Sequence, residues 1–175
     1  MPTFLKSIVV EAPVETVFGF HEREDALRLL SPRFPPLRVI LKTGGIKPGS
    51  RVELKIGPFL WIAVHTAYEK NRLFADEQVQ GPFAKWVHRH EFEAVDQATR
   101  LTDRVEYRLP GREWMNRLFG WAAQLALHQM FRRRHQMTKR YCEKGPDENF
   151  RAQCLTAGRE LVCCGCCNAG WSSRS

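Results

Sequence analysis

Apolar and polar residues alternate over most of the first two thirds of the chain, and this pattern predicts a β-sheet. The segment Arg51–Ile56 shows it most clearly, because Val52, Leu54 and Ile56 share one face and charged residues share the other. Short turns separate the segments from Leu37 onward, and short turns favour antiparallel neighbours. The predicted strands are Phe4–Glu11, Leu37–Thr43, Arg51–Ile56, Leu60–Tyr68, Leu73–Gln80, Lys85–Glu93 and Arg100–Arg108.

Helical spacing replaces this alternation in two places. Val14–Glu24 follows Pro13, which suits the first turn of a helix, and Asp25–Leu30 continues as a second short helix. A long helix is predicted over Arg112–Arg140. The order predicts an α+β helix-grip fold, with a curved antiparallel sheet of about seven strands around a long C-terminal helix and two short helices after the first strand. The expected sheet-facing stripe of the long helix is Trp114, Leu118, Trp121, Ala122 and Leu125, followed by Met130 and Phe131.

Two neighbouring strands, Leu73–Gln80 and Lys85–Glu93, carry an unusual mixture of side chains on one face. Glu77, Arg89 and Glu91 are hard to bury, so we expect the opposite face to point inward. That face mixes aromatic residues with histidine and aspartate, and buried polar groups need partners. A polar-lined cavity is therefore predicted. Its polar residues are His65, Asp76, Gln78, His88, His90 and Asp103.

Small-molecule sites commonly combine apolar walls with a few convergent polar groups. We therefore expect the polar set to orient a small hydrophobic or amphipathic ligand in an apolar pocket. The expected ligand contacts also include Trp86, and the expected walls are Phe4, Val39, Val52, Leu54, Trp61, Phe74, Phe92, Tyr107, Leu118 and Trp121.

Three other interpretations of the polar set stay open. It can form a hydrogen-bond network that fixes the hairpin around Gly81–Phe83. It can support acid–base catalysis, with His88 or His90 as the base and Asp76 or Asp103 as its partner. The pair His88-x-His90 can also bind a metal together with His65 or Asp76. Because two-residue histidine spacing is common by chance and no oxyanion donor is evident, we favour ligand binding and expect no metal and no other cofactor.

The chain carries a net charge of +8, and its densest basic cluster is Arg132–Arg134 with Lys139 and Arg140. Basic patches can bind nucleic acid or acidic partners. Cations at a helix C-terminus also complement the helix dipole and remain solvated. No aromatic residues are interleaved with the cluster, so we expect it to be solvated and do not favour nucleic-acid binding. The sequence does not indicate an oligomeric state.

Length and cysteine placement bear on organisation and location. The 175 residues favour one domain over 1–141, and all six cysteines lie in 142–175, a tail expected to be poorly ordered. No run of about 18 apolar residues suggests a membrane span. The N-terminus lacks the pattern of a signal peptide, so a cytoplasmic protein is expected.

The predicted order of elements, together with Glu11–Phe18 (EAPVETVF), resembles the START-like or Bet v 1-like superfamily, also called SRPBCC or polyketide cyclase/dehydrase and lipid transport. Asp76–Phe83, Trp86–His90 and Thr102–Tyr107 are similar to a subgroup of small bacterial-type members. The resemblance covers roughly Pro2–Tyr141. It implies a deep cavity between sheet and long helix, usually for apolar or amphipathic molecules. It leaves open carriers and enzymes, with a cyclase/dehydratase-type enzyme as the alternative here.

Overall fold

Seven antiparallel strands form one sheet in the part of the chain that the computed structural model describes, namely residues 1–31, 37–111 and 113–143 without the side chains of 113–118. The strands are β1 (Thr3–Val10), β2 (Leu37–Lys42), β3 (Arg51–Ile56), β4 (Phe59–Glu69), β5 (Leu73–Gln80), β6 (Lys85–Val95) and β7 (Ala98–Arg108). Their order is β1-β7-β6-β5-β4-β3-β2. The first strand therefore pairs with the last, and β1 and β2 form the edges.

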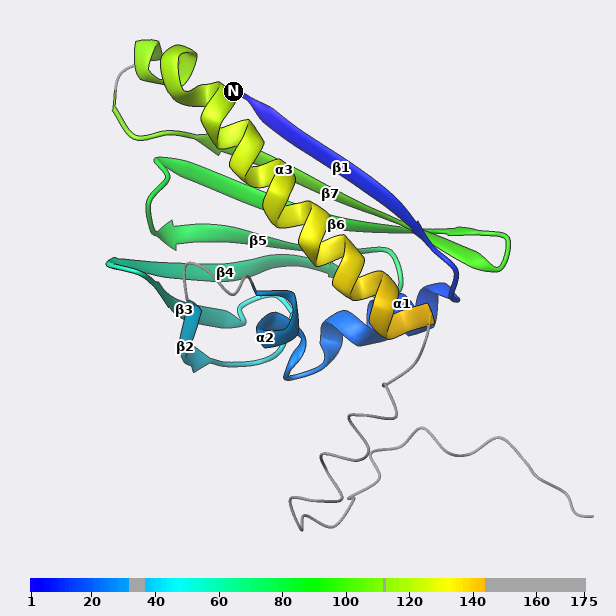
Figure 1. The fold of residues 1–175 in the computed structure, drawn as a ribbon. Coiled ribbons are helices and arrows are strands. Elements are labelled where there is room, and N and C mark those ends of the chain that lie inside the picture. The colour runs from blue at the N-terminus through cyan, green and yellow to red at the C-terminus, as the bar shows by residue number, and fades with distance from the viewer. Residues whose placement is uncertain (32–36, 112, 144–175) are drawn as a thin grey trace, which may run out of the picture. The chain divides into compact units, whose positions relative to one another are not determined.

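Three helices complete this unit: α1 (Val14–Glu22), α2 (Ala26–Leu30) and α3 (Glu113–Glu143). In Figure 1, α3 runs diagonally across one face of the sheet, and α1 and α2 lie near its C-terminal end. Residue contacts between α3 and β1, α1 and α2 agree with this arrangement. The predicted α+β helix-grip architecture is confirmed, and the element bounds lie within a few residues of those predicted.

Tight turns fix how the central strands pair. Asn71, between β4 and β5, and Asp96, between β6 and β7, have φ of 62° and 53°. Asparagine and aspartate tolerate this left-handed conformation better than most residues. The β6–β7 turn sets Val95 opposite Ala98, and from there the register runs unbroken to Lys85 opposite Arg108. This hairpin therefore decides which inward-facing side chains of β6 and β7 are neighbours.

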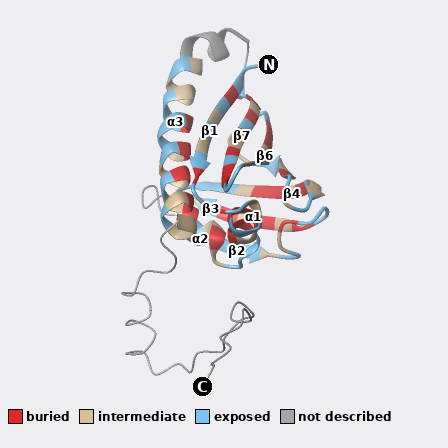
Figure 2. Cartoon of the chain, turned by 90° about the vertical axis from the view of Figure 1, so that its right-hand side faces the viewer, coloured by how far each residue is buried: buried red, intermediate tan, exposed pale blue. Residues whose placement is uncertain are grey.

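The inner face of the sheet carries two apolar clusters, and Figure 2 shows buried residues along the strands and along α3. One cluster lies under α1 and the other under α3. The α1 cluster consists of Val10, Ala12, Val17, Phe18, Ile46, Phe74, Phe92 and Leu101. The α3 cluster consists of Phe4, Trp86, Val105, Tyr107, Leu127 and Phe131. Burying a large apolar side chain contributes about 1.5–3 kcal/mol, so both clusters stabilise the fold.

The sheet-facing stripe of α3 differs from the predicted one. Trp121 is 69% exposed and Leu125 is 53% exposed, so the prediction that they cover the sheet is wrong. Among the described side chains of this helix, the buried ones are Phe131, which was predicted, together with Leu127, His135 and Thr138. The reason is that two of these four buried positions are polar, and a stripe defined by apolar residues alone does not pass through them. Trp114 and Leu118 fall outside the described side chains.

The C-terminal end of the described chain is helical. α3 continues through Cys142 and Glu143, two residues past the predicted domain boundary, and the remainder of the predicted tail, 144–175, lies outside the described residues. No helix in the described ranges combines the length and apolar character needed to cross a membrane.

Cys142 gives a test of how firmly the end of α3 is docked. Its side chain packs against the α1 cluster, and burial raises the pKa of the thiol from 9.0 to about 12. Because the thiolate is the reactive form, its fraction at pH 8 falls about a thousandfold. We expect iodoacetamide to label Cys142 far more slowly in the folded chain than in guanidinium, with a rate that keeps rising beyond pH 9. Peptide mass spectrometry measures this, and equal folded and unfolded rates would contradict the docking.

Candidate functional site

A band of polar side chains separates the two apolar clusters on the inner face of the sheet. Along β6 the inward residues run from Trp86, in the α3 cluster, through His88 and His90 to Phe92, in the α1 cluster. Along β7, Asp103 lies between residues of the same two clusters. The predicted inward orientation of His88, His90 and Asp103 is therefore confirmed.

Asp103 is the centre of this band. The Asp103 residue is 2% exposed, and its carboxylate contacts three imidazoles. Nε2 of His88 donates to Oδ1 at 2.9 Å, and Nε2 of His135 donates to Oδ2 at 2.5 Å. Nδ1 of His90 lies 2.7 Å from Oδ1, although its alignment departs from hydrogen-bond geometry. One carboxylate thus joins two strands and the long helix.

The local sequence explains why these side chains meet. His90 lies opposite Asp103 in the β6–β7 register, and His88 follows on the same face because side chains of a strand alternate. His135 comes four residues after Phe131 on α3, which places both on the same side of the helix. Phe131 stacks on Phe4 and contacts His88 edge-on, so apolar packing brings His135 to Asp103.

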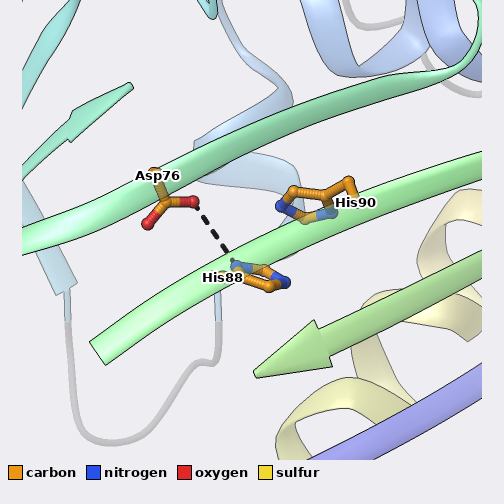
Figure 3. Close-up of side chains that lie close together, drawn as sticks. All are labelled: Asp76, His88 and His90. Atoms are coloured by element: carbon orange, nitrogen blue, oxygen red, sulfur yellow. Dashed lines mark ion pairs between the residues drawn. The ribbon is translucent and has the colours of Figure 1, made fainter. Parts of the chain in front are cut away.

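A second carboxylate approaches from β5. Asp76 lies opposite His88 in the β5–β6 register, and its Oδ1 is 3.5 Å from Nδ1 of His88. Figure 3 shows the carboxylate of Asp76 and one nitrogen of each of His88 and His90 turned toward a common space. The Asp76 side chain is 17% exposed, whereas that of Asp103 is 3% exposed. Asp76 is therefore the carboxylate that a ligand can reach.

Burial and these partners compete in setting the charges. Burial alone would raise the pKa of Asp103, but the surrounding imidazoles of His90, His135 and His88 pull that pKa well below its ordinary value. Burial would likewise lower the pKa of His88, but Asp103 and Asp76 outweigh it and raise that pKa. Asp76 has a lowered pKa because contact with His88 outweighs burial. Asp103 and Asp76 are therefore anionic around a His88 that favours its protonated form.

Three other histidines have lowered pKa values. Burial lowers the pKa of His90 to about 3, and His88 adds to the shift. Burial also lowers the pKa of His21 to about 4, and that of His65 falls for the same reason. Nδ1 of His21 donates to the carbonyl oxygen of Val17 at 2.8 Å. These three imidazoles are neutral near pH 7 and present uncharged nitrogens to their surroundings.

The polar band opens into a cavity of about 170 Å³. Polar lining residues from the sheet are His65, Asp76, His88 and His90. Apolar lining residues include Leu30, Ile46, Val52, Leu54, Ile56, Trp61, Ala63, Phe74, Trp86 and Met130. His21 and the cations Arg23, Lys42 and Arg134 complete much of the wall. The cavity therefore has a polar end and a broad apolar wall.

Nine of the seventeen predicted site and wall residues line this cavity, and five of the others lie in the core or at a turn. Gln78 instead holds the β5–β6 turn, where its Nε2 donates to the carbonyl oxygen of Phe83 at 2.7 Å. The hairpin around Gly81–Phe83 is thus fixed by this amide, while the histidine–aspartate network lies at the centre of the sheet. Asp103 lies behind the histidines, and the remaining three, Phe4, Phe92 and Tyr107, belong to the apolar clusters.

Two further wall predictions are wrong. Val39 is on the edge strand β2 and is 44% exposed, and Trp121 is on the outer side of α3. Leu118 falls outside the described side chains. Both errors have one cause, since apolar character alone does not say which face of an edge strand or helix is covered.

Sequence reasoning missed several residues of the site. His135 was not singled out, and its one usable signal is its position four residues after Phe131. Met130 was expected to cover the sheet, and His21 entered only as part of a helix. Arg134 was expected to be solvated with the other cations, but it lines the cavity, and its guanidinium carbon lies 5.5 Å from the centre of the Phe131 ring.

The remaining cations of that cluster do not form one uniform surface. Arg132 is exposed, Arg133 is half-buried, and Nζ of Lys139 lies 3.2 Å from Glu143. With Arg134 turned to the cavity, the cluster is divided among several directions. This division weakens the interpretation of the cluster as a binding surface for an acidic partner.

Replacing Asp103 tests whether this carboxylate organises the site. Asp103→Asn leaves a buried neutral amide among three imidazoles, and breaking a buried pair from one side costs about 3–5 kcal/mol. We expect the free energy of unfolding in urea to fall by about 3 kcal/mol. The matched control is Glu91→Gln on the same hairpin, whose partner Arg104 is 3.4 Å away on the outer face. That change should cost less than about 1 kcal/mol. Similar losses of unfolding free energy in both variants would contradict the role of Asp103 in organising the site.

Comparison with known proteins places this geometry in context. Residues 10–133 match the family model described as polyketide cyclase / dehydrase and lipid transport. No curated protein matches the sequence. Among solved structures, TTHA0849 from Thermus thermophilus is similar with a TM-score of 0.65 and 14% identity, covering 83% of this chain and 100% of that one.

Two other solved structures share the fold. A START superfamily protein from Mycobacterium smegmatis has a TM-score of 0.58 and 16% identity, over 81% of this chain and 97% of its own. CV1439 from Chromobacterium violaceum has a TM-score of 0.61 and 12% identity, over 83% and 98% of the two chains. Since the family model spans well over half of the residues of this chain, the chain belongs to the polyketide cyclase / dehydrase and lipid transport family.

Proposed function

We propose that this chain binds a small hydrophobic or amphipathic molecule in the cavity between the sheet, α2 and α3. The observation that carries the proposal is the cavity's division into a broad apolar wall and a polar end at Asp76, His88 and His90. This is how small-molecule sites are commonly built. The family description, which names lipid transport beside polyketide chemistry, supports the same class of ligand.

The size of the cavity limits the ligand. Its volume of about 170 Å³ is close to that of an engineered apolar cavity of about 150 Å³ that binds benzene. A ligand of one or two rings, or a short chain, fits this space. The apolar wall from Val52, Leu54, Trp61 and Ala63 would hold the ligand's hydrocarbon part.

The polar end would orient the ligand. The neutral imidazoles of His65 and His90 and the carboxylate of Asp76 line the same side of the cavity and offer both donors and acceptors. A ligand with a hydroxyl or carbonyl group would pair there in place of water, and unpaired polar groups at that end would disfavour a purely hydrocarbon molecule.

A cyclase- or dehydratase-type enzyme is the second candidate, and one observation favours it. His88 lies between two carboxylates, Asp76 on the cavity side and Asp103 behind. A histidine in such surroundings can transfer a proton to or from a bound substrate. An enzyme would lose turnover on His88→Ala while still binding its substrate, whereas a carrier would change only in affinity.

Blocking the apolar wall tests the binding proposal. Ala63 is buried on β4 and lines the cavity, so Ala63→Phe would fill space that a ligand needs. We expect the affinity for the two-ring amphipathic fluorescent dye 2-naphthol, measured by fluorescence titration, to fall at least tenfold. The physical reason is direct occlusion, because a phenyl group takes up much of a cavity of this size.

The matched control lies on the same strand. Thr66 is exposed, and Thr66→Phe adds the same ring outside the cavity. Its dye affinity should equal that of the unaltered chain. Near-ultraviolet circular dichroism checks that Ala63→Phe keeps its packing, since overpacking costs about 1–3 kcal/mol. Unchanged dye affinity in a folded Ala63→Phe chain would contradict the proposal. Native mass spectrometry of the fresh protein would then identify any co-purifying ligand of the unaltered chain.

A further inference from the structure

Three metal-ligating side chains converge at the polar end of the cavity. Asp76 on β5 lies directly opposite His88 on β6, and His90 follows two residues later on the same face. One potential ligand atom from each of the three lies within 4.8 Å of the other two. Donor atoms around a tetrahedral zinc ion lie about 3.3 Å apart, given metal–ligand distances of about 2.0–2.2 Å. Small side-chain rotations therefore bring the three into range of one ion.

The nitrogens that face this point are fixed by Asp103. Nε2 of His88 donates to Asp103 at 2.9 Å, so its Nδ1 is left to face Asp76. Nδ1 of His90 is turned toward Asp103 at 2.7 Å, which leaves Nε2 of that ring for the shared space seen in Figure 3. Metal-binding histidines usually direct their other ring nitrogen to a carboxylate in this way, because the carboxylate fixes the ring and strengthens the donor.

The charges at the site also suit a divalent cation. Two carboxylates, Asp76 and Asp103, lie within reach of His88 in a largely buried place. A divalent ion at this point would balance the negative charge of both carboxylates. Arg134 also lines this cavity, and its guanidinium repels a cation. It lies on α3, on the helix side of the cavity.

We propose that Asp76, His88 and His90 bind a divalent first-row transition metal ion, with Asp103 as the outer partner of both imidazoles. Two imidazoles and one carboxylate favour zinc and its neighbours over Mg²⁺ or Ca²⁺, which prefer oxygen ligands. Because all three residues line the cavity, the ion would have a coordination position open to it. Three protein ligands with one open position are typical of zinc sites that act on a ligand rather than hold a fold together.

The test is a calorimetric titration of the full-length chain with Zn²⁺ after chelator treatment and buffer exchange, with Mg²⁺ as the comparison. Asp76→Asn is the main variant, since this side chain is partly exposed and the change conserves its shape. His90→Gln is the second, and His128→Gln, an exposed histidine on α3, is the matched control. We expect one Zn²⁺ equivalent to bind at least tenfold more weakly in the first two variants and unchanged in the control, with no Mg²⁺ binding at that site.

Cysteine thiolates are common zinc ligands, so the cysteines of the C-terminal segment need their own control. A full-length variant with Cys163, Cys164, Cys166 and Cys167 changed to serine should keep the cavity equivalent. The proposal is overturned if this equivalent disappears in the serine variant, or if Asp76→Asn and His90→Gln bind Zn²⁺ as the unaltered chain does. The metal site does not depend on the apolar wall, so unaltered dye binding beside absent Zn²⁺ binding would overturn this inference and leave the ligand-binding proposal intact.

Discussion

The buried carboxylate of Asp103 is the constraint on which the rest of the site depends. An ionised carboxylate inside a protein costs several kcal/mol unless hydrogen bonds and opposite charges compensate it. Here the compensation comes from His88 and His90 on the neighbouring strand and from His135 on the long helix. The β6–β7 register and the placement of α3 must both be correct before the charge is satisfied. The same contacts therefore fix the helix on the sheet and orient the imidazoles.

The cavity follows from where α3 makes its apolar contacts. The helix packs on the α3 cluster near β1, β7 and β6, and its later residues meet α1 and α2. Strands β3, β4 and β5 are covered less closely, and their inward residues Val52, Leu54 and Ala63 line the open space. The polar band lies at the boundary between the packed and the open part of the sheet. Its residues therefore have one side in the core and one side toward a ligand.

Period-two alternation made the sheet and the inward face of β5, β6 and β7 predictable from sequence, because charged residues on the opposite face leave one consistent choice. Alternation did not predict the face of α3 or the exposure of Val39, since these depend on which neighbour covers them. His135 escaped because a polar residue on a buried helix face breaks the apolar pattern that identifies such a face. The cavity histidines could be predicted from the sequence. Which carboxylate each histidine faces could be assigned only from the strand register.

The two aspartates show how one polar band can serve two purposes. Asp103 is enclosed by three imidazoles and contributes to structure, and a well-packed apolar substitute for such a group is often as stable or more so. Stability alone therefore does not account for a polar band in a core. Asp76 differs, because its side chain reaches the cavity and it contacts His88 at 3.5 Å rather than at hydrogen-bond distance. A buried network in which Asp103 is hydrogen-bonded on the inner side and the contact of Asp76 on the outer side is loose leaves binding capacity where a ligand or an ion can use it.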